Sequence, residues 1–384
     1  MNRKELKALI NECIKESTMP PGFNITDLQP LSSLTSIDNI QEETEDKFLG
    51  APVNDLPPEE MDAYLKRIAS KQTDKTDKFK YPYIHRSNIV DDFGNVINQD
   101  KLKSLIKVRP EKLLKQNTKM QKSGGANYVF YDISLPALRG LIVDESTNEF
   151  KIVNTCPGAG ACKVYCYAKK GGYVQWKASS LFQTRMVNFL LNDYFGFKSK
   201  LLSELNAAEK TKAKKGVKVV LRWHDSGDFM SEKYLQMAFD IAKATPNIIH
   251  YAYTKRVGMV SGADKPKNFV FNFSLGAAAP EEGQITPEKK QSIVVPKQVF
   301  QQYMHKEEDG WKFNSKDDEN TVKNKLSLKY NIDDDSILTY KELLDTPYNP
   351  DVDTTPKYNV IVIPGDGDVS AMRKDVLGTY LFIH

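Results

Sequence analysis

Residues 217–253 read VKVVLRWHDSGDFMSEKYLQMAFDIAKATPNIIHYAY. The segment opens with a nearly continuous apolar run at 217–223, which is typical of a strand in a parallel sheet. Ser231 is a plausible N-cap for the amphipathic helix that follows, and Pro246 ends that helix before a second apolar run at 248–253. Strand, helix and strand in this order predict two parallel strands joined by a helical crossover.

The same alternation continues on both sides of this unit. Further strands are predicted at 128–133, 150–153, 269–275 and 359–363, and a long amphipathic helix at 176–206. We therefore predict an α/β protein built on a partial (β/α) barrel, a relative of the TIM barrel.

The chain divides by composition into four parts. Residues 1–124 are predicted as an N-terminal arm and helical region, within which 17–60 lacks sustained periodicity. The core follows at 125–280. Residues 281–356 are rich in charge and are predicted as an insertion with a few short helices and no core of its own, and 357–384 as a C-terminal strand that returns to the core.

Composition limits the function classes. Among the 384 residues, 54 basic side chains nearly balance 50 acidic ones, a net charge of +4. Nucleic acid is thus a weak candidate partner, because phosphate binding needs a concentrated basic face, and the lysines of 210–218 are predicted to form a solvated loop. No run approaches the roughly 20 apolar residues of a membrane span and the N-terminus is no secretory signal, so we expect a cytoplasmic protein without a membrane partner.

Cysteine usage is uneven. Cys13 lies on the apolar stripe of a predicted helix at 1–16, where a small buried side chain is the simpler interpretation. Cys156, Cys162 and Cys166 instead crowd into the segment CPGAGACKVYCYA. Thiolates are the preferred ligands of iron–sulfur clusters, and three of them leave one iron of a cubane open. Zinc, or three thiols without a metal, are the alternatives.

Four segments resemble the radical S-adenosylmethionine (radical SAM) superfamily, in particular its divergent phage-encoded members. They are CPGAGACKVYCYA at 156–168, RWHDSGDF at 222–229, YTKR at 253–256 and GDGDVSAMRKDVLGTYLFIH at 365–384. The common spacing in the superfamily is C-x3-C-x2-C. This chain has C-x5-C-x3-C, so both gaps are longer. If the chain is phage-encoded, its expected location is the host cytoplasm.

The resemblance implies a [4Fe–4S] cluster on Cys156, Cys162 and Cys166, carried by a loop after the first barrel strand. It also implies that the open iron binds the amino and carboxylate groups of SAM. In the superfamily an aromatic residue beside the last cysteine packs near the adenine, which here implies Tyr165 or Tyr167.

A second superfamily motif, Gly-Gly-Glu after the second strand, contacts the SAM amino group. Ser226, Gly227 and Asp228 stand at that place, with one glycine kept and Asp for Glu. The resemblance therefore implies that these three residues bind the cofactor, with Asp228 as the acidic member.

Strand parity suggests a polar pocket near the C-terminal strand ends, because side chains alternate between the faces of a strand. The polar pairs are Arg222 with His224, His250 with Thr254, and Asn272 with Ser274. If all share one face, Asn272 and Ser274 are candidates for cofactor binding. His224 and Asp228 are candidates for catalysis, since His titrates in a useful range. An internally satisfied hydrogen-bond network is the alternative. Asp366 and Asp368 resemble a cation loop but are more simply turn residues.

These observations favour an iron–sulfur protein, and the resemblance implies a radical-SAM-like enzyme acting on a small-molecule substrate that the sequence does not identify. Two other interpretations stay open: a non-catalytic iron–sulfur redox or assembly protein on the same fold, and a zinc-stabilised binding protein.

Overall fold

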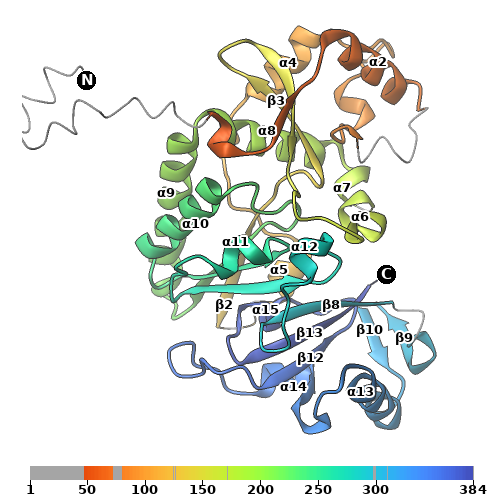
Figure 1. The fold of residues 1–384 in the computed structure, drawn as a ribbon, viewed down its shortest axis with the longest axis vertical. Coiled ribbons are helices and arrows are strands. Elements are labelled where there is room, and N and C mark those ends of the chain that lie inside the picture. The colour runs from red at the N-terminus through yellow and green to blue at the C-terminus, as the bar shows by residue number, and fades with distance from the viewer. Residues whose placement is uncertain are drawn as a thin grey trace, which may run out of the picture. The chain divides into compact units, whose positions relative to one another are not determined.

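The computed structural model describes residues 47–71, 80–123, 125, 127–170, 172–296, 300–308 and 310–383 (Figure 1). The predicted helix at 1–16 with Cys13, and the arm before residue 47, lie outside this range. Within it, no helix is both long and apolar enough to cross a membrane.

The main element is a sheet of eight parallel strands, in the order β11-β12-β13-β8-β7-β6-β5-β2. The α/β class is confirmed, and the alternation of parallel strands with helices is consistent with a partial (β/α) barrel. The strands are β2 (Tyr128–Ile133), β5 (Lys218–Trp223), β6 (Ile249–Thr254), β7 (Phe269–Ser274), β8 (Gln291–Pro296), β11 (Ile337–Thr339), β12 (Tyr358–Val362) and β13 (Val376–Ile383).

Helices cover both faces of this sheet. The helices are α2 (Pro58–Ala69), α4 (Gln99–Lys107), α5 (Thr118–Ser123), α6 (Cys162–Tyr165), α7 (Gly172–Gln175), α8 (Lys177–Asn192), α9 (Tyr194–Ala213), α10 (Glu232–Ala244), α11 (Val257–Ser261), α12 (Ala279–Glu282), α13 (Lys316–Tyr330), α14 (Tyr340–Asp345) and α15 (Val369–Met372). Helices α8 to α11 bury their apolar stripes against one face of β2, β5, β6 and β7. Helices α5, α14 and α15 pack on the opposite face, while α13 packs beside β8 and β11 to β13.

A smaller antiparallel sheet, in the order β1-β4-β3, precedes the cysteine segment in the chain. Its strands are β1 (Val53–Asp55), β3 (Arg139–Asp144) and β4 (Glu149–Asn154). Helices α2 and α4 share a second apolar cluster with β3 and β4. Part of the predicted arm therefore belongs to the packed body, since Phe48 and Leu49 are buried in the main core.

Two stretches differ from the sequence prediction. The helix predicted at 176–206 is broken at Asp193, whose carboxylate caps α9 by accepting from Gly196 N at 2.8 Å. Residues 281–356 supply β8, which lies between β7 and β13, and the edge strand β11. Their apolar side chains, including Val295 and Leu326, form a core cluster with β12 and β13. This stretch is thus part of the sheet, and the boundaries of the domains stay a prediction.

The strand register contradicts the prediction that the three polar pairs share one face of the sheet. Arg222 is paired with Tyr251, and Asn272 with Tyr253, so these residues share one face of the sheet. His250 is paired with Leu221 and lies on the opposite face, as does Thr254. The assumption that all three polar pairs share a face was wrong, because parity within one strand does not fix its phase relative to the next.

Candidate functional site

The cysteine loop runs from Cys156 to Cys166 and begins two residues after β4. The resemblance implied a loop directly after the first strand of the parallel sheet, which is β2. The loop instead follows β4 of the antiparallel sheet. The loop lies against the turn after β7, where Ala159 bridges Ala277 (Figure 1, near α6 and α12). It is thereby placed at the carboxyl ends of the parallel strands, the edge where α/β proteins usually bind ligands.

Backbone contacts hold the loop to this edge. Gly160 N and Cys162 N both donate to Gly276 O, at 3.1 and 3.0 Å, and Ala278 N donates to Gly158 O at 2.8 Å. A Cβ built on Gly160 would lie 1.9 Å from Ala277 O, so only glycine permits this approach.

The three thiols lie close enough together for the charge of one to affect the pKa of another. Burial is the main cause that raises the pKa of Cys156 to about 12; the hydrogen bond from Leu138 N opposes this rise, and the charges of Asp228, Cys166 and Cys162 add to it. Burial also raises the pKa of Cys162, whereas the ammonium of Lys255 lowers it. Cys156 Sγ accepts a hydrogen bond from Leu138 N at 3.3 Å. Without a metal the Cys156 thiol is therefore protonated at neutral pH, and metal binding must release its proton.

Among the residues that the structure describes, no group of three or more His, Cys, Asp or Glu side chains is arranged to hold a metal ion. A cubane cluster makes a different demand, because each thiolate binds its own iron instead of meeting the others at a common ion.

Ser226, Gly227 and Asp228 lie next to the base of the cysteine loop. Asp228 N donates to the carbonyl of Thr155, the residue before Cys156, at 2.8 Å. Gly227 has φ 90°, and a Cβ there would lie 2.8 Å from Leu135 Cβ. The structure thus brings the second motif beside the first.

The Asp228 carboxylate is nevertheless engaged within the protein. It accepts from Phe229 N at 2.8 Å, from Thr254 Oγ1 at 2.7 Å and from Lys255 N at 2.8 Å. Burial raises its pKa, which these three bonds oppose. Ser226 Oγ likewise donates to Leu135 O. Both side chains join the loops that follow β2, β5 and β6.

Tyr165 and Tyr167 flank Cys166 at the surface. The hydroxyl of Tyr165 is 3.4 Å from Leu275 O and fills the space beside Gly276. Tyr167 is 52% exposed, yet its hydroxyl lies 3.4 Å from Arg222 NH2. Its ring packs edge-on against Tyr173, with ring centroids 5.6 Å apart. Both rings are partly exposed at this loop.

His224 lies in an aromatic environment. Its Nε2 is 2.6 Å from the hydroxyl of Tyr234 and its ring packs edge-on against Phe229. Burial and the charge of Arg222 lower its pKa to about 3, so the ring is neutral. Its Nδ1 is buried without a hydrogen-bond partner, and its φ of 64° is unusual for a non-glycine residue.

The remaining predicted residues are also buried. Asn272 Nδ2 donates to Ala252 O at 3.3 Å and Ala371 O at 3.0 Å, while its Oδ1 has no partner. Ser274 is buried opposite Ser292 in the ladder to β8. His250, on the other face, accepts from Trp223 Nε1 at 3.1 Å and is 2.9 Å from Thr245 Oγ1. These bonds give His250 a structural place beneath α10.

Sequence reasoning missed a buried polar cluster next to Tyr167. Arg222 NH1 donates to Asp368 Oδ2 at 2.7 Å, and the hydroxyl of Tyr251 donates to the same oxygen at 3.2 Å. Asp132, paired with Arg222 in the sheet, and Asp225 complete the cluster. One signal was present in the sequence, since Asp132 is an ionisable residue inside an otherwise apolar strand.

A cavity of about 390 Å³ lies far from this chemistry, at the amino ends of the parallel strands. Its lining includes Lys218, Asn247 and Asn268, which stand at the starts of β5, β6 and β7. It therefore does not belong to the site at the cysteine loop.

The fold and the site define an α/β protein that carries a three-cysteine loop at the carboxyl ends of parallel strands. The chain belongs to the Gene product 88 family, a phage family whose model matches residues 111–336. That match includes the cysteine loop and the Ser226–Asp228 turn. No match was found among curated proteins or among solved structures.

Proposed function

We propose that this chain binds a [4Fe–4S] cluster through Cys156, Cys162 and Cys166 and acts as a radical-SAM-like enzyme. The observation that carries the proposal is the placement of three thiols on one loop at the carboxyl edge of the sheet, each close enough for its charge to act on another's pKa. Three thiolates bind three irons of a [4Fe–4S] cluster and leave the fourth iron open to a further small molecule.

The surroundings of the thiols suit a cluster. Leu138 N donates a hydrogen bond to Cys156 Sγ, and hydrogen bonds of this kind stabilise a thiolate ligand. Lys255 places a positive charge near Cys162, which favours a cluster of net negative charge. When bound, the cluster would supply an open coordination site and one-electron chemistry.

This chain's own residues would bind and orient the second ligand. Tyr165 and Tyr167 offer aromatic faces beside Cys166. Gly227 lets the turn after β5 lie close to Leu135 and Pro136, and Asp228 N joins the same turn to Thr155. Asp228 holds the Lys255 amide, and so fixes the end of β6 against the loop.

The engaged state of Asp228 favours a second candidate, a non-catalytic iron–sulfur redox or assembly protein. Its carboxylate already accepts three hydrogen bonds within the protein, and the Ser226 hydroxyl is also committed. In this function the open iron would bind another ligand, and SAM would leave the cluster unaffected.

Metal content tests the shared part of both candidates. Protein purified anaerobically and reconstituted with iron and sulfide should contain about four irons per chain. Replacing Cys156, Cys162 or Cys166 with Ala should abolish iron binding, whereas Cys13→Ala, the matched control, should not. Stoichiometric zinc without iron would instead identify a zinc-stabilised protein.

A further inference from the structure

Two buried carboxyl groups face each other at the carboxyl ends of β2 and β5. Asp132 is the penultimate residue of β2, and Asp225 follows β5 by two residues. The two strands are paired along their whole length, and Asp225 N donates to the carbonyl of Ile133, next to Asp132, at 3.2 Å. The Asp225 carboxyl raises the pKa of Asp132 both through its charge and through a side-chain hydrogen bond, which places the two groups in contact.

Neither carboxyl group has a full set of donors. Both residues are more than nine-tenths buried. Oδ1 of Asp132 and Oδ1 of Asp225 each lack a hydrogen-bond partner from any donor, although Asp225 Oδ2 accepts from the Tyr173 hydroxyl at 2.9 Å. Two carboxylates cannot hydrogen-bond to each other, but a carboxyl and a carboxylate can share one proton.

The charges around the pair lead to the same conclusion. Arg222 is a cation whose charge acts on Asp132, and its guanidinium forms an ion pair with Asp368 at 2.7 Å. Tyr173 and Tyr167 face the pair from α7 and from the turn after Cys166, and both are neutral hydroxyls at neutral pH. The charge of Arg222 lowers the pKa of Asp132, but less than burial and the charge of Asp225 raise it. Two ionised aspartates would therefore place two like charges in contact and out of water beside one cation that Asp368 already shares.

We propose that Asp132 and Asp225 hold one shared proton and form the acid–base pair of the site beside the cysteine loop. The shared proton does not depend on a cluster, whereas its use in a reaction rests on the proposed function. The substrate class is one that gains or loses a proton at a group bound over Tyr167 and Tyr173. Aspartic proteases use the same arrangement of two carboxyls in contact.

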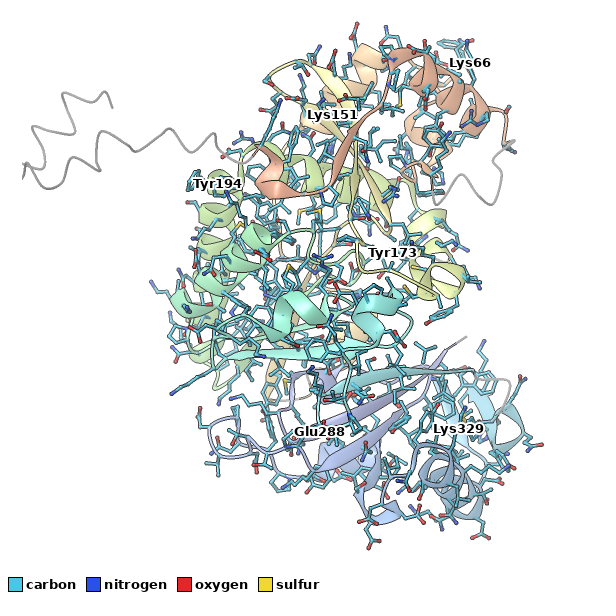
Figure 2. All side chains as sticks on the ribbon, in the orientation of Figure 1. Lys66, Lys151, Tyr173, Tyr194, Glu288 and Lys329 are labelled. Atoms are coloured by element: carbon cyan, nitrogen blue, oxygen red, sulfur yellow. The ribbon has the colours of Figure 1, made fainter. Side chains whose placement is uncertain are left out.

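The geometry also supplies a route for the proton. The Tyr173 hydroxyl donates to Asp225 Oδ2, and Tyr173 is only half-buried on α7, where Figure 2 labels it. When a basic group of the bound substrate takes the hydroxyl proton of Tyr173, Asp225 Oδ2 passes the shared proton to the tyrosine oxygen, so the tyrosine stays neutral. The substrate then carries the proton, and the pair is left as two carboxylates that regain one proton from water. Tyr173 thus relays the proton between the pair and the substrate.

Burial, followed by the charge of Asp225, raises the pKa of Asp132 to about 8, in agreement with this geometry. Infrared spectroscopy of the full chain, without added iron, measures the protonated carboxyl directly. We expect one protonated carboxyl per chain at pH 7 that disappears with a midpoint near pH 8. Asp132→Asn and Asp225→Asn should each remove the signal, since an amide fills the same space and still donates a hydrogen bond.

Asp264→Asn is the matched control, because Asp264 is 97% exposed on its side chain and should leave the signal unchanged. In deuterated water, Tyr173→Phe should slow exchange of the carboxyl proton while keeping the signal. A wild-type protein without a protonated carboxyl at pH 7 overturns the proposal, as does a signal that survives in both Asn variants. Unchanged exchange in Tyr173→Phe overturns the route. Cluster loading is not needed for any of these results, so they are independent of the proposed iron site.

Discussion

The close contact between Gly160 and the turn after β7 gives a quantitative prediction for Gly160→Ala. The added Cβ would lie 1.9 Å from Ala277 O, 2.4 Å from Ala277 C and 2.7 Å from Ala278 N. All three are backbone atoms, so the contact cannot be relieved by turning a side chain. The loop and the turn must move apart.

The cost follows from what this movement breaks. Three backbone hydrogen bonds cross the contact: Gly160 N and Cys162 N to Gly276 O, and Ala278 N to Gly158 O. Each contributes about 1 kcal/mol net, and overpacking costs about 1–3 kcal/mol. The two costs do not add in full, because a loop that moves away relieves the overlap but loses the hydrogen bonds. We therefore expect Gly160→Ala to lower the free energy of unfolding by about 2–4 kcal/mol. It should also lower iron content, since Cys162 moves with the loop.

Urea unfolding followed by circular dichroism measures the first effect, and iron content after anaerobic reconstitution measures the second. Gly262→Ala is the matched control. A Cβ there would come no closer than 3.7 Å to Gly258 O, so it should change stability by less than about 0.5 kcal/mol. Wild-type stability and iron content in Gly160→Ala would refute the reasoning that this contact positions the cysteine loop.

Three further predictions follow. Arg222→Met leaves Asp368 buried without its guanidinium and should cost about 3–5 kcal/mol in urea unfolding; a loss under about 1 kcal/mol would contradict a buried ion pair. Burial lowers the pKa of both His224 and His250 to about 3, so the unfolded chain binds more protons than the folded one between about pH 6.5 and 3. Stability should therefore fall with decreasing pH in that window, by about 1.4 kcal/mol per pH unit for each histidine, and His250→Gln should reduce the slope by one proton; an unchanged slope would show that His250 does not titrate this way. Asp228→Ala should cost about 1–3 kcal/mol because it leaves buried amides without an acceptor, whereas Asp228→Asn, which keeps one oxygen, should cost less; equal losses in thermal unfolding would argue against these hydrogen bonds.

Local signals in the sequence predicted most of the parallel sheet. The apolar runs at 217–223 and 248–253 became β5 and β6, and the Ser231 hydroxyl accepts from Tyr234 N at 3.1 Å as an N-cap. Hydrophobic periodicity and capping depend on neighbouring residues alone, which is why they could be identified without a structure.

Relations between distant segments could not be predicted. β8 contains an apolar run but lies in a stretch whose composition is dominated by charge, and its partner β13 is far away in sequence. The phase of β6 relative to β5 was also missed, and it placed His250 and Thr254 on the opposite face. Strand register depends on pairing across the sheet, which a single strand does not encode.

The candidate site shows the same limit. The three cysteines and the Ser226–Asp228 turn were found as motifs, and the structure places them side by side. The pair of Asp132 and Asp225 comes from two segments and required the β2–β5 register to be seen. That Asp228 faces the end of β6 could not be inferred from its motif either.

Electron paramagnetic resonance of the anaerobically reconstituted, chemically reduced protein, with and without SAM, tests the central claim most directly. The account predicts a signal of a reduced [4Fe–4S] cluster that changes when SAM is added, since a new ligand alters the open iron. Cleavage of SAM to 5′-deoxyadenosine should accompany the change, and both should be lost in Cys162→Ala. A cluster signal that SAM leaves unchanged, with no cleavage product, would contradict the enzyme and leave a non-catalytic iron–sulfur protein. The absence of any cluster signal after reconstitution would contradict the iron site itself.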